Sequence, residues 1–144
     1  DLKETQLVDP DGVSLLLDLQ GNVTETSGAN FLIVDRGTIV SPTTVNILPG
    51  VSRGVVVSLA QKLGIPYAER DLQVHSVMNA DEAFLASTPF CLCPATRING
   101  VPIGDGQIGP IYRRLLAAWS EEVGLSIDQQ VFDCARRRTA PAAA

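Results

Sequence analysis

Apolar residues in the first third of the chain fall into short runs divided by polar turns. Four runs alternate with turns that contain Gly, Asn or Asp, at residues 14–19, 23–26, 30–34 and 38–40. Leu, Val, Ile and Thr favour strands, and Gly21-Asn22 between the first two runs is typical of a hairpin. Asp35-Arg36-Gly37 forms the turn between the second two runs. The pattern predicts two successive β-hairpins, and therefore an antiparallel meander.

The spacing of apolar residues changes after Gly50 to that of one helix face. A first stripe predicts a helix that Gly64 ends, with apolar residues at 51, 55, 56, 59, 60 and 63. A second predicts a helix opened by Gly109-Pro110, with its stripe at Ile111, Leu115, Leu116, Trp119 and Val123. Shorter segments lie between them, with strands expected at 66–70, 83–87 and 91–97 and a brief helix or turn at 73–81. Strands and helices mix without a βαβ rhythm, so we expect one α+β domain.

Composition and charge narrow the class of protein. The chain has 144 residues, of which 45% are hydrophobic and 19% charged, as in a single domain with a packed core. Its formal net charge is −5, the wrong sign for a protein that holds a phosphate backbone. No apolar run approaches the roughly 18 to 20 residues that span a bilayer. These features predict a cytoplasmic protein with neither nucleic acid nor membrane as a partner.

The end of the chain and the cysteines carry little chemistry. Residues 134–144 are basic and then rich in Ala and Pro, which predicts a flexible tail after a domain of residues 1–133. Cys91, Cys93 and Cys134 have no metal-ligand spacing, and His75 is the only histidine. We interpret the thiols as small apolar side chains and expect no metal site.

Three places could hold a charged ligand. Gly50-Val51-Ser52-Arg53 begins a predicted helix, where free N–H groups and the helix dipole attract anions. Ser52 either caps that helix or donates to a phosphate. Thr88, next to a tight turn between strands, is a second donor or an ordinary turn threonine. Glu25 follows an apolar strand and is either a solvent-facing residue or a carboxylate that a partner must stabilise.

Taken in order, several segments resemble the class IV, or fold-type IV, pyridoxal-phosphate enzymes. That family includes branched-chain and D-amino-acid aminotransferases and aminodeoxychorismate lyase. The resemblance spans residues 13–123, with matching stretches at Leu17–Glu25, Asn30-Phe31, Leu48–Arg53, Ala80–Phe84, Ser87-Thr88, Pro94, Ile98–Gly100, Ile103–Gly106 and Gly109-Pro110. It implies the large pseudo-barrel domain of the D-amino-acid aminotransferase-like fold.

The resemblance also implies roles for single residues. Glu25 would bond the pyridine nitrogen of pyridoxal 5′-phosphate and favour the protonated ring. Leu48 would pack on that ring. Val51 and Ser52 would bind the phosphate at the helix start, and Thr88 would add a donor. The implied partners are an amino acid and a 2-oxo acid, and the implied assembly of the complete enzyme is a homodimer.

Two features depart from the family pattern. Family members hold the cofactor as a Schiff base on a lysine upstream of the glutamate, but Lys3 and Lys62 are the only lysines and neither matches that segment. We therefore expect the lysine before Asp1, so that residues 1–133 form an N-terminally incomplete cofactor-binding domain that is inactive alone. Pro89 offers no N–H and Phe90 is bulky where branched-chain members have small residues that help hold the substrate carboxylate.

Three functions remain open on the sequence. The leading interpretation is the cofactor domain of an aminotransferase for branched-chain or D-amino acids. The second keeps the cofactor but catalyses carbon–carbon lyase chemistry, like aminodeoxychorismate lyase. The third is a non-catalytic remnant of the same fold, against which the retained Glu25, Ser52 and Thr88 argue.

Overall fold

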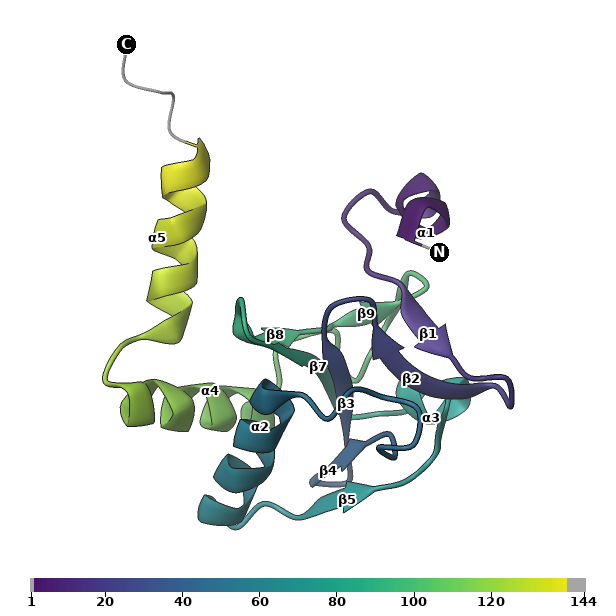
Figure 1. Ribbon diagram of the computed structural model, residues 1–144, viewed down its shortest axis with the longest axis horizontal. Coiled ribbons are helices and arrows are strands. Elements are labelled where there is room, and N and C mark those ends of the chain that lie inside the picture. The colour runs from purple at the N-terminus through teal and green to yellow at the C-terminus, as the bar shows by residue number, and fades with distance from the viewer. Residues whose placement is uncertain (1, 140–144) are drawn as a thin grey trace.

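The computed structural model describes residues 2–139, which form five helices and ten strands. Their bounds in chain order are α1 Leu2–Val8, β1 Leu15–Leu17, β2 Asn22–Thr26, β3 Asn30–Asp35, β4 Thr38–Ser41, α2 Val51–Lys62, β5 Tyr67–Glu69, β6 Leu72–Gln73, α3 Val74–Met78, β7 Glu82–Ser87, β8 Cys91–Pro94, β9 Arg97–Ile98, β10 Val101–Pro102, α4 Pro110–Val123 and α5 Ile127–Thr139. Figure 1 shows this order from the N-terminal purple to the C-terminal yellow. The α+β class expected from the sequence is confirmed.

The first four strands form the predicted meander. Each of β1, β2 and β3 pairs antiparallel with the strand that follows it. The β3–β4 hairpin closes through Arg36 and Gly37, whose φ angles are 49° and 77°, with Asp35 opposite Thr38. Positive φ at both central residues gives the turn a twist that matches the flanking strands.

Strands from later in the chain complete an open eight-stranded sheet. β7 pairs antiparallel with the other edge of β3, and β8 follows it. β5 lies parallel to β4, and β6 pairs with β2. Outside this sheet, β9 and β10 form a separate small hairpin, so the strand predicted at 91–97 is interrupted after Pro94. The central β3 is thus covered at both edges.

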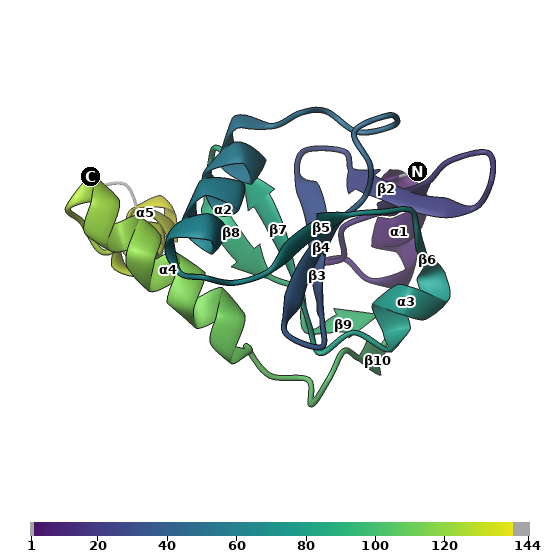
Figure 2. The ribbon, with the colours of Figure 1, turned by 90° about the horizontal axis from the view of Figure 1, so that it is seen from below.

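Both faces of β3 are buried, which explains its uninterrupted apolar sequence. Leu32 and Val34 pack with α2 and α4, while Phe31 and Ile33 face a second cluster. The two groups alternate because successive side chains of a strand point to opposite faces. Figures 1 and 2 show α2 and α4 on one side of the sheet, with α3 and β9–β10 on the other.

The two predicted helices form within one residue of their expected ends. α2 ends near Leu63, and Gly64 has φ 66°, as its role in stopping the helix requires. α4 begins at Pro110, where the carboxylate of the buried Glu82 accepts the N–H groups of Ile111 and Tyr112, both at 2.9 Å. A carboxylate at this position accepts hydrogen bonds from amides that have no partner within the helix, and its negative charge interacts favourably with the positive end of the helix dipole.

The C-terminal segment differs from the prediction. Residues 134–139, expected in a flexible tail, belong to helix α5, which Figure 1 shows standing away from the sheet. Residues 140–144 of that predicted tail lie outside the described residues. No helix within the described range has the length and apolar character needed to cross a bilayer.

Candidate functional site

One cavity of about 360 Å³ is lined by all five residues singled out from the sequence. Glu25 comes from β2, Leu48 from the loop before α2, Val51 and Ser52 from the first turn of α2, and Thr88 from the turn between β7 and β8. The remaining lining residues come from the β2–β3 turn, the loop before α2 and the end of β7: Thr26, Ser27, Gly28, Ala29, Asn30, Pro49, Gly50, Ala86 and Ser87. The fold therefore gathers residues from three stretches that are distant in sequence, residues 25–30, 48–52 and 86–88.

The start of α2 offers hydrogen-bond donors to this cavity. Gly50 is the N-cap and has no side chain to cap the helix, and the first helical bond runs from the Gly54 N–H to the Gly50 carbonyl. The N–H groups of Val51 and Ser52 consequently have no helical acceptor. Within the described residues the hydroxyl of Ser52 makes no hydrogen bond, although only 6% of the residue is exposed. Ser52 is thus not the helix cap, and the turn has the chemistry of an anion site.

Glu25 is half-buried and held at both oxygens rather than facing solvent freely. Its Oε1 accepts the backbone N–H of Leu48 at 3.1 Å, and its Oε2 accepts the side-chain amide of Asn30 at 2.8 Å. A carboxylate has about four lone-pair sites, so acceptor capacity remains for a further donor. The two bonds fix an acidic group at the cavity wall.

Asn30 is the residue of this site that the sequence interpretation missed. It is 4% exposed, and the same amide nitrogen that bonds Glu25 also donates to the Leu48 carbonyl at 2.8 Å. Its Oδ1 lies so near Gly50 that a Cβ there would approach to 2.2 Å. Asn30 lies opposite Glu25 in the antiparallel β2–β3 pair. The hairpin predicted from the sequence could therefore have indicated that these two side chains are neighbours.

Two apolar side chains at the cavity are left uncovered. Leu48 is 69% exposed and Val51 is 81% exposed, although Val51 was expected on the buried stripe of its helix. The two residues after it, Ser52 and Arg53, are buried instead. The cavity therefore presents apolar surface beside its polar donors, as small-molecule sites commonly do.

The Thr88 side of the cavity is tied to the β2–β3 turn. Ser87, the last residue of β7, donates its hydroxyl to the Gly28 carbonyl at 2.7 Å. This bond holds two loops that are far apart in sequence against each other. Thr88, the next residue, is exposed and lines the cavity, so its hydroxyl is accessible to a ligand.

Neither lysine lines the cavity. The Nζ of Lys62 bonds the carboxylate of Glu122 on α4 at 3.0 Å, and this hydrogen bond raises the pKa of Lys62. Lys3 belongs to α1. The arrangement agrees with the interpretation of Lys62 as a surface residue of α2.

Cys91 and Cys93 lie in surroundings that favour the protonated thiol. Cys91 and Cys93 are free and half-buried, and burial raises the pKa of both thiols, which favours the unreactive protonated form. The described part of the chain contains no group of three His, Cys, Asp or Glu residues placed to hold a metal ion.

Comparisons with curated sequences give relatives that include D-alanine and branched-chain-amino-acid aminotransferases. The D-alanine aminotransferase of Listeria monocytogenes serovar 1/2a (strain ATCC BAA-679 / EGD-e) is 37% identical over 111 residues, which cover 76% of this chain and 38% of that protein. The branched-chain-amino-acid aminotransferase of Escherichia coli (strain K12) is 33% identical over 106 residues, covering 73% of this chain and 34% of that protein. The chain therefore spans little more than a third of the length of these relatives.

Solved structures and a family model agree with the sequence matches. A branched-chain amino acid aminotransferase from Thermotoga maritima, described as putative in its crystal structure, has a TM-score of 0.70 at 34% identity, over 74% of this chain and 39% of that one. The Escherichia coli branched-chain amino acid aminotransferase has a TM-score of 0.73 at 31% identity, over 74% and 37% of the two chains. The model for amino-transferase class IV matches residues 3–98, more than half of the chain. The chain therefore belongs to the class IV aminotransferase family.

Proposed function

We propose that this chain supplies the part of an aminotransferase that holds pyridoxal 5′-phosphate, in an enzyme that moves an amino group between an amino acid and a 2-oxo acid. The proposed amino acids are branched-chain or D-amino acids, the classes named for its relatives. One observation carries the proposal. A fixed carboxylate and the open start of a helix line the same cavity, together with an unused serine hydroxyl.

The donor set fits the two charged ends of this cofactor. The amides of Val51 and Ser52, the Ser52 hydroxyl and the dipole of α2 suit a phosphate group. Glu25 suits the protonated nitrogen of a pyridine ring, because an acidic partner stabilises the positive charge. The cavity volume of about 360 Å³ lies within the roughly 300 to 1,000 Å³ usual for small-molecule sites.

When bound, the cofactor would supply a protonated ring that withdraws electrons from the amino-acid Cα. The residues of this chain orient and stabilise it. Asn30 and the Leu48 N–H fix Glu25, so that its carboxylate does not have to reorganise when it meets the ring. The exposed Leu48 side chain offers an apolar contact for a flat ring, and the Thr88 hydroxyl adds a donor for the phosphate.

We further propose that the lysine that carries the cofactor comes from outside these 144 residues. Lys62 is engaged with Glu122, and neither Lys62 nor Lys3 belongs to the cavity lining. A lysine that accepts the cofactor also has to move a proton at the reacting carbon, so it must lie at the site. Incubation with pyridoxal 5′-phosphate, borohydride reduction and peptide mass mapping test this point. A single stoichiometric adduct on Lys3 would overturn it, whereas no specific lysine adduct supports it.

Binding of pyridoxamine 5′-phosphate to the 144-residue chain tests the site itself. This ligand is an amine and cannot condense with lysine side chains, so calorimetry reports the non-covalent contacts alone. We expect Glu25→Gln and Ser52→Ala each to weaken binding by about tenfold, the contribution of one hydrogen bond to a charged group.

Matched variants guard against nonspecific effects. Ser58→Ala changes an exposed serine of the same helix, whose hydroxyl donates to the Gly54 carbonyl, and Glu121→Gln changes an exposed glutamate of α4. Neither residue lines the cavity, so both controls should bind like the wild type. Equal affinity of Ser52→Ala and Ser58→Ala would refute the phosphate site, and absence of binding by the wild type would favour a remnant of the fold.

A further inference from the structure

Arg53 follows Ser52 in the turn that we assign to the phosphate, yet its side chain serves another purpose. We propose that Arg53 is a positioning residue: its guanidinium fixes the first turn of α2 to strands β4 and β5 and does not bind the phosphate. The inference rests on the proposed function, because it concerns how the phosphate donors of that site are held.

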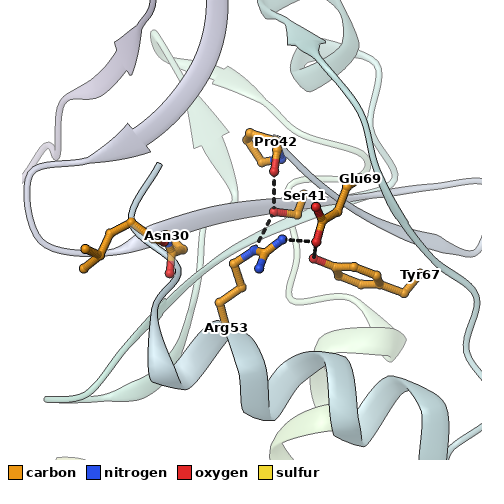
Figure 3. A network of polar contacts seen from close by, with 7 residues as sticks. Asn30, Ser41, Pro42, Arg53, Tyr67 and Glu69 are labelled. Atoms are coloured by element: carbon orange, nitrogen blue, oxygen red, sulfur yellow. Dashed lines mark hydrogen bonds and ion pairs between the residues drawn. The ribbon is translucent and has the colours of Figure 1, made fainter. Parts of the chain in front are cut away.

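Arg53 is buried and makes several polar contacts, whereas the other arginines whose burial the structure describes are exposed. Only 6% of the residue is exposed. Its Nε donates to the Ser41 hydroxyl at 2.9 Å, and its Nη2 pairs with the Glu69 carboxylate. The guanidinium carbon lies 5.9 Å from the centroid of the Tyr67 ring. Figure 3 shows these groups together, with the guanidinium turned toward Ser41 and Glu69.

The partners of Arg53 are themselves fixed. Ser41 is fully buried at the end of β4, and its hydroxyl donates to the Pro42 carbonyl at 2.9 Å. Glu69 ends β5, where it pairs with Ser41 in the parallel β4–β5 ladder. Tyr67, on the same strand, donates its hydroxyl to Glu69 at 3.5 Å. Arg53 therefore connects the helix start to two hydrogen-bonded strands, β4 and β5.

This connection acts on the donors of the cavity. Arg53 is the third residue of α2, and the Ser52 N–H and hydroxyl belong to the same turn. Gly50, the N-cap, packs against Asn30 on the cavity side. The turn is thus held from two sides, and loss of the Arg53 contacts would let it shift relative to Glu25. Small displacements of positioned donors weaken binding strongly.

Arg53 is not placed as a phosphate ligand. It is absent from the lining of the cavity, to which Val51 and Ser52 both contribute. Its positive charge is paired with Glu69, and two of its donor nitrogens are already engaged. A buried arginine with these contacts depends on its fixed planar geometry as well as on its charge.

A phosphate-binding role and a positioning role of Arg53 predict opposite effects of a Glu69 substitution on phosphate affinity. If Arg53 bound phosphate by charge, Glu69→Gln would free that charge and strengthen phosphate binding. If Arg53 positions the turn, Glu69→Gln removes its anchor and weakens phosphate binding. Arg53→Lys separates the roles again, because lysine keeps the charge but lacks the fork that reaches both Ser41 and Glu69.

The experiment compares pyridoxamine 5′-phosphate with pyridoxamine, which lacks the phosphate, on the 144-residue chain. The ratio of the two affinities reports the contribution of the phosphate group alone. A variant that distorts the fold and weakens both ligands equally leaves this ratio unchanged. Variants are Arg53→Lys, Arg53→Met and Glu69→Gln, with Arg36→Met as a control that removes one positive charge from the exposed β3–β4 turn. Melting temperatures verify that each variant is folded.

We expect Glu69→Gln and Arg53→Lys each to lower the affinity ratio by about tenfold and Arg36→Met to leave it unchanged. A wild-type ratio in Arg53→Lys, or a raised ratio in Glu69→Gln, would overturn the positioning role while leaving the phosphate site intact. A wild type without any preference for the phosphorylated ligand would refute the proposed site itself. If Arg53→Met does not fold, the two conservative variants still decide the question.

Discussion

Removal of the Asn30 amide tests the part of the site that the sequence interpretation missed. Asn30 is almost fully buried and donates from one nitrogen to both Glu25 and the Leu48 carbonyl, each at 2.8 Å. Asn30→Ala removes both hydrogen bonds but only a few buried atoms, so the cavity it leaves is small. The Glu25 carboxylate would keep a single partner, the Leu48 N–H.

The expected loss of stability is estimated from the two hydrogen bonds that Asn30 donates, one to the charged Glu25 carboxylate and one to the neutral Leu48 carbonyl. A hydrogen bond to a charged group contributes about 1.5 to 3 kcal/mol and one between neutral groups about 0.5 to 1.5 kcal/mol. Glu25 is only half-buried and Leu48 is exposed, so water replaces part of what is lost. We therefore expect the free energy of unfolding to fall by about 2 kcal/mol, the lower end of the combined range.

Denaturant unfolding measures this loss, and binding of pyridoxamine 5′-phosphate measures its effect on the site. Asn46→Ala is the matched control, because Asn46 lies in the same loop before α2 and is exposed, with its amide donating to Asp18 at 3.2 Å. Its change in stability should stay within about 0.5 kcal/mol, as for surface substitutions generally.

Two results would refute the reasoning. Equal stabilities of Asn30→Ala and Asn46→Ala would mean that the Asn30 bonds contribute nothing net. A destabilised Asn30→Ala that binds the ligand like the wild type would mean that Glu25 needs no support from Asn30.

Three further predictions concern neighbouring features. Gly50→Ala should destabilise the fold by about 1 to 3 kcal/mol, because its Cβ would meet Asn30 at 2.2 Å, whereas Gly54→Ala, with open space, should be neutral or stabilising in the same unfolding assay. Glu82→Gln should lower stability by about 1 to 3 kcal/mol, since a single amide oxygen replaces two acceptors at the start of α4; an unchanged unfolding midpoint would contradict this. Burial raises the pKa of Tyr112 to about 12 from 10.0. The contribution of Tyr112 to stability should therefore be fully present below pH 10 and be lost, by up to about 3 kcal/mol, as the pH rises through about 12. Tyr112→Phe should make the decline of alkaline unfolding curves smaller by this amount, and an unchanged decline would contradict the assignment.

Short-range patterns in the sequence determined most of the secondary structure. Gly37 marks the turn of the β3–β4 hairpin, and Gly64 and Pro110 set a helix end and a helix start. These features depend on backbone preferences of one or two residues, which act before any tertiary contact forms. Helix α5 escaped this reasoning because its C-terminal half is basic and has no apolar stripe of its own.

The sequence also indicates which residues form the candidate site, but not how they are held. Glu25, Leu48, Val51, Ser52 and Thr88 were singled out in advance, and the fold brings them to one cavity. Whether Ser52 caps its helix could not be read locally, because a serine at a helix start suits a cap and an anion site equally well. The structure decided this by placing Gly50 at the N-cap.

The supports of the site were decided by tertiary structure alone. Asn30 reaches Leu48 across 18 positions of the chain, and Arg53 reaches Glu69 across 16. Such pairs depend on how the meander folds against α2 and on the parallel pairing of β4 with β5, which no local pattern specifies. A polar residue becomes buried only where the completed fold offers it partners, and for Asn30 and Arg53 those partners come from other elements.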